Sequence, residues 1–208
     1  MVVSRYDRRV RHGRTERLHQ EDVCQALAVD VGPRGSRKYQ GEGGPGFADV
    51  AHLLDVHNGD PAQTGRLVEV ATYTVAIGNA DAHGKNLSLL LPPGGRISLA
   101  PLYDVMCTVH YPEAVGPQGR VRVSTELAMF VDGVREIDAV DVAALRAEAA
   151  RWHLSDDTDD RIHGLLTRFD DALDAAAHGV PQVPVPLVER LRARAARLRA
   201  GAPAGAGR

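Results

Sequence analysis

Apolar side chains recur at three- and four-residue spacing along much of the chain, the pattern of helices with a buried face. The most apolar stretch covers residues 63–78 and places Leu67, Val70, Val75 and Ile77 on one broad face. The pattern predicts helices at residues 19–29, 46–57, 63–78, 141–152, 157–177 and 186–199. The sequence therefore predicts a mainly α domain.

Strand signals are few. Residues 87–91 and 96–100 are short apolar stretches separated by Pro92-Pro93-Gly94-Gly95, which predicts a β-hairpin. Residues 2–6 read as a short isolated strand, 31–46 as a loop rich in glycine and proline, and 116–120 as an exposed loop. Residues 1–200 are expected to form one mainly α domain with this small central hairpin, followed by a disordered tail at 201–208.

Composition narrows the function classes. The chain is 44% hydrophobic and 25% charged, with a net charge of −2, so no overall basic field indicates nucleic-acid binding. The arginine-rich helix at 186–199 is expected to be a solvated face beside an apolar seam at Val188, Leu191 and Leu198. No apolar run approaches the roughly 20 residues that span a bilayer. The first residues do not have the apolar stretch of a signal peptide, and Cys24 and Cys107 are expected to be reduced thiols. The sequence therefore predicts a cytoplasmic location.

One polar stretch lies between the most apolar helix and the hairpin. It reads Gly-Asn-Ala-Asp-Ala-His-Gly-Lys-Asn at residues 78–86, and the hairpin returns the chain to Asp104. The order resembles the active centre of protein kinases. There a catalytic Asp orients the acceptor hydroxyl, an Asn five residues later binds magnesium, and an Asp beyond a short hairpin binds the metals. Asp81, Asn86 and Asp104 have this order and spacing, and their oxygens suit Mg²⁺.

Further segments make the resemblance more specific. The chain resembles the HipA family of bacterial serine/threonine kinases, the toxins of HipA–HipB toxin–antitoxin systems, from its first residues to about residue 180. The matching segments are the loop 78–86, Ser4-Arg5-Tyr6-Asp7-Arg8, His19-Gln20-Glu21-Asp22, Lys38-Tyr39, Gly43-Gly44-Pro45, Pro101-Leu102-Tyr103-Asp104-Val105 and Glu126-Leu127-Ala128-Met129.

The resemblance implies a role for individual residues. Asp81 corresponds to the catalytic Asp, and Asn86 and Asp104 correspond to the Mg²⁺ ligands. His83 and Lys85 lie in the same loop and are expected to steady phosphate oxygens or the catalytic carboxylate. Arg5 and Tyr6 lie where the hinge of the family lines the adenine pocket.

The function implied is transfer of a phosphoryl group from Mg-ATP to a protein Ser or Thr by a kinase C-lobe of HipA type. The chain is expected to begin at the hinge and to lack the N-lobe, and a translation component is the expected substrate class. A HipB-like antitoxin or a separate N-lobe is the expected partner. Two alternatives remain open: a catalytically inactive remnant that acts as a binding module, and a metal-dependent phosphoesterase using Asp81, His83 and Asp104.

Overall fold

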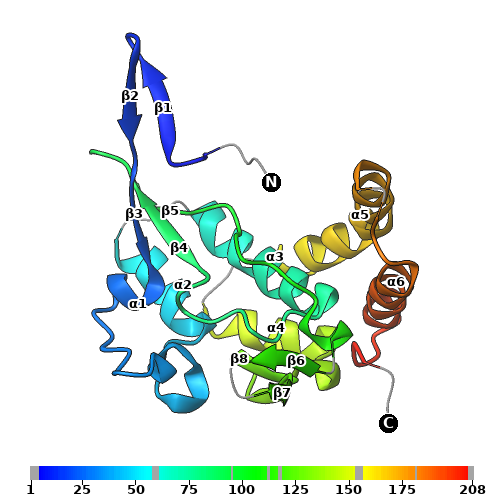
Figure 1. The fold of residues 1–208 in the computed structure, drawn as a ribbon. Helices are drawn as coiled ribbons and strands as arrows, with labels where there is room; N and C mark the ends of the chain where they lie inside the picture. Colours follow the sequence, from blue (N-terminus) through cyan, green and yellow to red (C-terminus); the bar gives the residue numbers. More distant parts are fainter. Residues whose placement is uncertain are drawn as a thin grey trace.

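The computed structural model describes residues 5–57, 61–94, 96–111, 113–116, 119–152, 157–180 and 182–205. Figure 1 shows a mainly helical body that carries small two- and three-stranded sheets. The helices are α1 (Val23–Ala26), α2 (Phe47–Val56), α3 (Pro61–Ile77), α4 (Val142–Ala150), α5 (Thr158–Gly179) and α6 (Val185–Arg199), with 3₁₀ turns η1 (Ser36–Lys38), η2 (Gln40–Glu42), η3 (Thr108–His110) and η4 (Ile137–Ala139). Within the described residues, no helix has the length and hydropathy that a membrane crossing needs.

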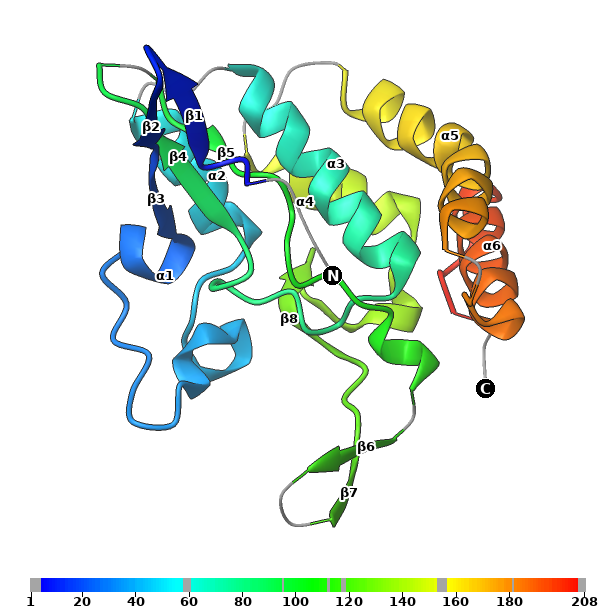
Figure 2. The ribbon, with the colours of Figure 1, turned by 45° about the horizontal axis from the view of Figure 1, so that its top comes forward.

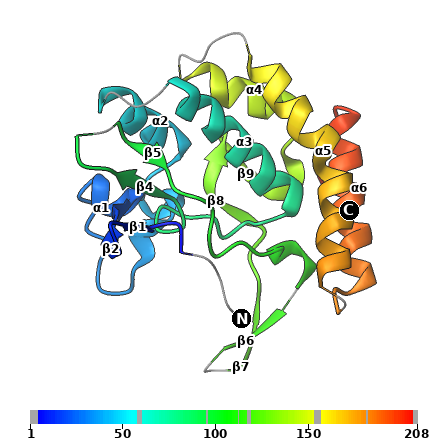
Figure 3. The same cartoon turned by 90° about the horizontal axis from the view of Figure 1, so that it is seen from above.

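Helix α3 is the centre of the hydrophobic core. It contacts α2, α4, α5 and α6, and Leu67 and Val75 are fully buried. Figures 2 and 3 show α5 and α6 side by side along one flank of the molecule, with α3 inside them. A helix that is apolar on most of its surface is stable only when other elements surround it, and this explains the central position of α3. The helix expected at residues 63–78 is therefore confirmed.

The hairpin expected at 87–100 is confirmed as β4 (Ser88–Leu91) and β5 (Ser98–Leu99). A third strand, β3 (His19–Asp22), pairs antiparallel with β4, so that Asp22 lies opposite Ser88. The prediction of a helix over residues 19–29 is thus wrong for its first turn, because the open edge of β4 binds this segment as a strand. The helix α1 begins only at Val23, where Asp22 caps it by accepting a hydrogen bond from the backbone of Gln25.

Three further hairpins show that the prediction of a single β-hairpin was wrong. They are β1 (Arg8–Arg11) with β2 (Arg14–Arg17), β6 (Glu113–Gly116) with β7 (Gly119–Arg122), and β8 (Glu126–Val131) with β9 (Val134–Glu136). The first two project from the body and are largely exposed, so they lack the alternating apolar pattern that predicts a strand (Figures 1 and 2). Of the exposed loop expected at 116–120, Gly116 ends β6, Gly119 and Arg120 begin β7, and residues 117–118 lie outside the described residues. Most of the strand expected at 2–6 also lies outside the described residues.

The C-terminal region contains the expected helices α4, α5 and α6, but it differs from the sequence expectation at residues 201–205. Ala204 is buried, and its amide donates a 2.8 Å hydrogen bond to the carbonyl of Val140. The amide of Gly205 donates to the carbonyl of Asp138 at 2.9 Å. The described part of the expected tail is therefore packed against the body rather than frayed.

Candidate functional site

The polar loop 78–86 begins where α3 ends. Gly78 has a φ of 72°, and a Cβ atom there would lie 2.5 Å from the Cγ2 atom of Val109. A glycine is therefore required at this helix end, both for its backbone conformation and for space. Thr108 ties the loop down, because its hydroxyl donates to the Gly78 carbonyl at 3.1 Å and accepts from the Ala80 amide at 2.8 Å. The loop is thus held against the segment that follows Asp104.

The structure brings Asn86 and Asp104 together, 18 positions apart in sequence. The Asn86 side-chain amide donates a 2.8 Å hydrogen bond to Oδ2 of Asp104. Asn86 is buried, and its Oδ1 atom has no hydrogen-bond partner among the residues that the structure describes, which is uncommon for a buried oxygen. A cation between the two side chains would satisfy this oxygen, and amide and carboxylate oxygens are ligands that Mg²⁺ accepts. The donor set therefore fits magnesium.

The backbone at Asp104 is in the left-handed region, with a φ of 54°. Such a conformation is uncommon for a residue other than glycine and is tolerated best by Asp and Asn. Tyr103 fixes the segment, because its hydroxyl donates to the Lys85 carbonyl at 2.7 Å. That donation uses the only phenolic proton, so the Ser88 hydroxyl donates to Tyr103 at 2.6 Å. These contacts hold Asp104 beside Asn86.

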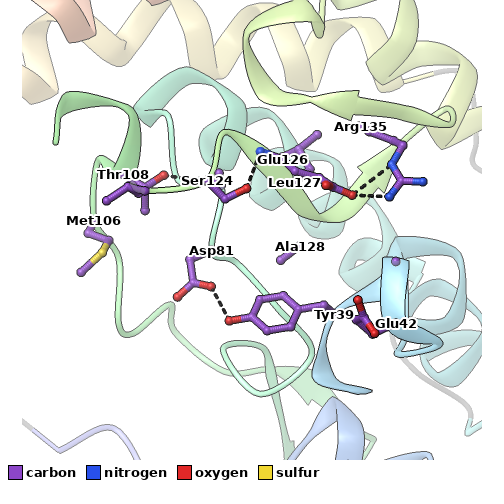
Figure 4. Close-up of a pocket in the computed structure, with 13 residues that line it drawn as sticks. Tyr39, Glu42, Asp81, Met106, Thr108, Ser124, Glu126, Leu127, Ala128 and Arg135 are labelled. Atoms are coloured by element: carbon purple, nitrogen blue, oxygen red, sulfur yellow. Dashed lines mark hydrogen bonds and ion pairs between the residues drawn. The ribbon is translucent and has the colours of Figure 1, made fainter. Parts of the chain in front are cut away.

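Asp81 is half-buried and faces Tyr39, whose hydroxyl donates to Oδ1 of Asp81 at 3.0 Å (Figure 4). Burial raises the pKa of Tyr39 to about 12, and the negative charge of Asp81 and the hydrogen bond add to the shift. Tyr39 therefore stays protonated and remains a donor to Asp81 at neutral pH. The sequence indicated Lys38-Tyr39 only as part of a family pattern, and assigned no role to the phenol.

Two glycines allow the segment with Tyr39 to approach the loop. The amide of Gly84 donates to the carbonyl of Lys38 at 3.1 Å. A Cβ atom at Gly84 would lie 2.4 Å from Pro45, and one at Gly44 would lie 2.3 Å from the carbonyl oxygen of Arg37. Both positions therefore require glycine for close packing, and the signal was present in the sequence as Gly43-Gly44-Pro45.

His83 is buried beside the same pair and packs edge-on against Tyr39, with ring centroids 5.3 Å apart. Burial lowers the pKa of His83, and the nearby ammonium group of Lys38 adds to this effect. The imidazole is therefore mainly neutral at neutral pH, and the amide of His83 donates directly to the backbone carbonyl of Asp81 at 2.9 Å. The direct contact with phosphate that the sequence suggested for His83 stays a prediction.

Lys85 is exposed, and its ammonium group lies 2.7 Å from Oδ2 of Asp22. The hydrogen bond that Lys85 donates to Asp22 raises the pKa of Lys85, so the ion pair persists at neutral pH. This pair joins the loop to the end of β3. The phosphate contact expected for Lys85 from the sequence stays a prediction. It would require the ammonium group either to leave Asp22 or to bind Asp22 and the phosphate at the same time.

Arg5 and Tyr6 lie on the segment that leads into β1. The guanidinium of Arg5 donates to both oxygens of the buried Asp7 carboxylate, at 2.8 and 2.6 Å, and this holds the pKa of Asp7 well below its usual range. Burial raises the pKa of Tyr103, and Tyr6 is close enough to add to that shift. The hinge segment therefore lies near the residues that position Asp104, while its contact with adenine stays a prediction.

A pocket of about 540 Å³ opens beside Asp81 (Figure 4). Its walls come from η2, the loop 78–86, the segment after Asp104, and β8 and β9. Asp81 lines this pocket, whereas Asn86 and Asp104 do not. No group of three or more His, Cys, Asp or Glu side chains suited to a metal occurs among the described residues.

Comparisons with known proteins identify the family of the chain. Residues 1–177 match the family described as HipA-like C-terminal domain. The chain is 42% identical over 131 residues to a protein of Sinorhizobium fredii named putative kinase Y4mE, covering 62% of this chain and 30% of that protein. It is 32% identical over 145 residues to the serine/threonine-protein kinase toxin HipA of Shewanella oneidensis, covering 64% of this chain and 30% of that protein.

A solved structure shows the same fold. It is the Shewanella oneidensis toxin–antitoxin complex of HipA, HipB and its operator DNA, which matches with a TM-score of 0.77 at 24% identity. The match covers 94% of this chain and 48% of that one. The chain thus spans about a third to a half of the length of these relatives.

Proposed function

The chain belongs to the HipA-like C-terminal domain family, and on that premise we propose that it is the catalytic C-lobe of a protein serine/threonine kinase. The observation that carries the proposal is the Asn86–Asp104 pair, with its 2.8 Å hydrogen bond and the unpartnered buried oxygen of Asn86. Mg-ATP, when bound, supplies the phosphoryl group and the metal charge that neutralises it. Asn86 and Asp104 would hold the magnesium.

Asp81 would orient the acceptor hydroxyl and receive its proton late in the transfer. Tyr39 supports this role, because its donation to Oδ1 fixes the carboxylate and leaves Oδ2 available to the acceptor. His83 packs against the Tyr39 ring and supports the phenol in turn. In this proposal Tyr39 is a positioning residue that acts through Asp81.

The wider assignments rest on the relatives. A matched structure contains HipB, and we extend a HipB-like antitoxin partner to this chain by family membership. A Ser or Thr of a translation protein as the acceptor, an N-lobe that completes the nucleotide cleft, and a cytoplasmic location belong to the same proposal. The alternative, a binding module without catalysis, predicts no role for the Asn86–Asp104 pair in binding nucleotide.

Calorimetry with Mg-ATP distinguishes these two functions. We choose Asp104→Asn because Asn tolerates the left-handed backbone at this position while removing the carboxylate charge. We expect the affinity for Mg-ATP to fall by about tenfold or more, as is typical when metal coordination is disturbed. The matched control is Asp132→Asn, which makes the same change at another left-handed position, with a φ of 49°, in the β8–β9 turn. Equal affinities for the two variants would contradict the assignment.

A further inference from the structure

The pocket beside Asp81 combines an apolar interior with a charged rim. Met106, Val123, Leu127 and Ala128 contribute apolar surface, and Glu42 of η2 lies among the lining residues (Figure 4). The volume of about 540 Å³ lies within the range of roughly 300–1,000 Å³ that is typical of ligand sites in proteins. The space is therefore large enough for an extended side chain together with part of its backbone.

Only some of the charged side chains on the pocket wall form ion pairs. Glu126 accepts a 3.0 Å hydrogen bond from Nε of Arg135, and the guanidinium of Arg135 also lies 4.9 Å from the ring centre of Phe130. Asp81 accepts from the neutral phenol of Tyr39, and the ammonium group of Lys38 lies 5.1 Å from the centre of the same ring. Within the described part of the chain, the exposed carboxylate of Glu42 has no hydrogen-bond or ion-pair partner. The pocket lining thus contains three carboxylates and one guanidinium, and it has an excess of negative charge.

This charge excludes one class of occupant and favours another. The phosphates of a nucleotide would be repelled by Asp81 and Glu42 on this side of the loop. A Lys or Arg side chain fits better, because its aliphatic stem can lie on apolar surface while the cationic end reaches a carboxylate at the rim. The site is also next to the carboxylate assigned to the acceptor hydroxyl.

We propose that this pocket is a subsite for a lysine or arginine close to the phosphorylated Ser or Thr of the acceptor protein, and that Glu42 is its specificity-determining residue. The proposal rests on the proposed kinase function, because it is the position of Asp81 that makes the pocket an acceptor site. It adds a substrate class, namely proteins with a basic segment beside the acceptor Ser or Thr. Neither the fold nor the Asn86–Asp104 pair specifies this class.

Binding of short peptides to the full chain tests the proposal without requiring phosphoryl transfer. The probes are two fluorescent nonapeptides with one central Ser, flanked on both sides by Arg in the first and by the neutral Gln in the second. Fluorescence anisotropy at about 50 mM salt limits screening of an exposed ion pair. We expect the Arg peptide to bind about fivefold tighter than the Gln peptide, the upper range for an exposed charge pair.

The variant Glu42→Gln should reduce the affinity for the Arg peptide to that for the Gln peptide. The matched control is Glu189→Gln, which removes the same charge from the exposed surface of α6 and should leave the preference unchanged. The reversal Glu42→Lys should make a third peptide, with Glu in place of Arg, the tightest binder. Circular dichroism checks the fold of each variant.

Equal binding of the Arg and Gln peptides, undetectable binding of both, or equal effects of Glu42→Gln and Glu189→Gln would each overturn the subsite. Loss of the subsite is distinguishable from failure of the kinase assignment, since Mg-ATP binding through Asn86 and Asp104 is measured separately. If the chain binds Mg-ATP as expected but shows no preference among the peptides, the subsite proposal is wrong and the proposed kinase function still stands.

Discussion

The phenol of Tyr39 and the carboxylate of Asp81 share one hydrogen bond at the edge of the pocket, and the environment of each group depends on the other. The Asp81 charge stabilises the protonated phenol, and the phenol fixes one oxygen of the carboxylate. His83 is buried against the same ring, and within the described residues its Nδ1 atom has no hydrogen-bond partner. The surroundings of Tyr39 and of His83 shift the pKa of each group, and two measurements follow from this.

The first concerns ionisation of Tyr39. With a pKa of about 12, Tyr39 should be roughly one-tenth ionised at pH 11, where a tyrosine with the usual pKa of about 10 is mostly ionised. Asp81→Asn should lower the pKa towards 10, but not fully, because burial makes the largest contribution. Carbon-13 NMR of the protein with labelled tyrosine measures the pKa of Tyr39, and the variant Tyr39→Phe identifies its resonance. Circular dichroism checks that the protein is still folded at each pH. A Tyr39 pKa unaffected by Asp81→Asn would contradict the contact.

The second concerns His83. Its folded pKa is lowered by burial, whereas in the unfolded chain it titrates near the ordinary value of about 6.5. The unfolded state therefore binds the proton first as pH falls, and the contribution of neutral His83 to stability is lost from about pH 6.5 down through the folded pKa. Urea unfolding at pH 7.5 and 5 should show a smaller loss of stability in His83→Gln than in the parent. An equal loss would mean that His83 is not buried as a neutral ring.

At the scale of elements, the site depends on how α3 ends. Arg194 of α6 is buried, and its guanidinium donates to the carbonyl of Val75 at 2.9 and 3.3 Å and pairs with Asp138. A cation at a helix C-terminus is favoured by the helix dipole. The guanidinium adds to the 3.1 Å hydrogen bond that the Val75 carbonyl accepts from the Gly78 amide. This contact stabilises the turn from which the polar loop begins.

Replacing Arg194 tests that role. Arg194→Met should lower the free energy of unfolding by about 2 kcal/mol, because it leaves a buried carbonyl without a charged donor. The control Arg192→Met, on the same helix, removes an arginine that pairs with Asp170 and Asp174 at a more exposed site and should cost less than about 1 kcal/mol. Urea denaturation measures both, and equal losses would contradict the capping role.

Arg194 also illustrates what the sequence could not reveal. The spacing of Leu191 and Leu198 correctly predicted a buried seam on α6, but periodicity cannot show that one arginine of the helix reaches inward to a carbonyl 119 positions earlier. The order of Asp81, Asn86 and Asp104 was sufficient to predict that the hairpin brings Asn86 and Asp104 together. The Tyr39 contact crosses 42 positions, and no local pattern predicts such a contact.

The strands show the same limit. Apolar residues beside a Pro-Pro-Gly-Gly turn predicted β4 and β5, whereas β1 and β2 are polar and exposed. Their hairpin has a turn signal in His12-Gly13, where both residues have positive φ, and Asp132-Gly133 gives a similar signal between β8 and β9. Turn chemistry would therefore have located two hairpins that hydrophobic alternation did not.

At the scale of the whole molecule, the polar loop contributes to two features. Asn86 lies beside Asp104, and Asp81 lines the pocket together with Glu42. A kinase needs its metal and nucleotide on one side of the catalytic carboxylate and its acceptor on the other, with the reacting groups in line. The proposed function therefore requires Asp81 to lie between the metal and the acceptor.

Phosphoryl transfer tests the central claim most directly. The chain is joined to the part that precedes the matched region in the Shewanella oneidensis HipA, and transfer from radiolabelled ATP to a Ser-containing protein is followed under single turnover. We expect transfer in this fusion, and Asp81→Asn should slow it by roughly 10²–10⁴-fold while leaving Mg-ATP affinity nearly unchanged, because in the proposed function Asp81 contacts the acceptor rather than the nucleotide. An Asp81→Asn fusion that transfers phosphate as fast as its parent would contradict the account.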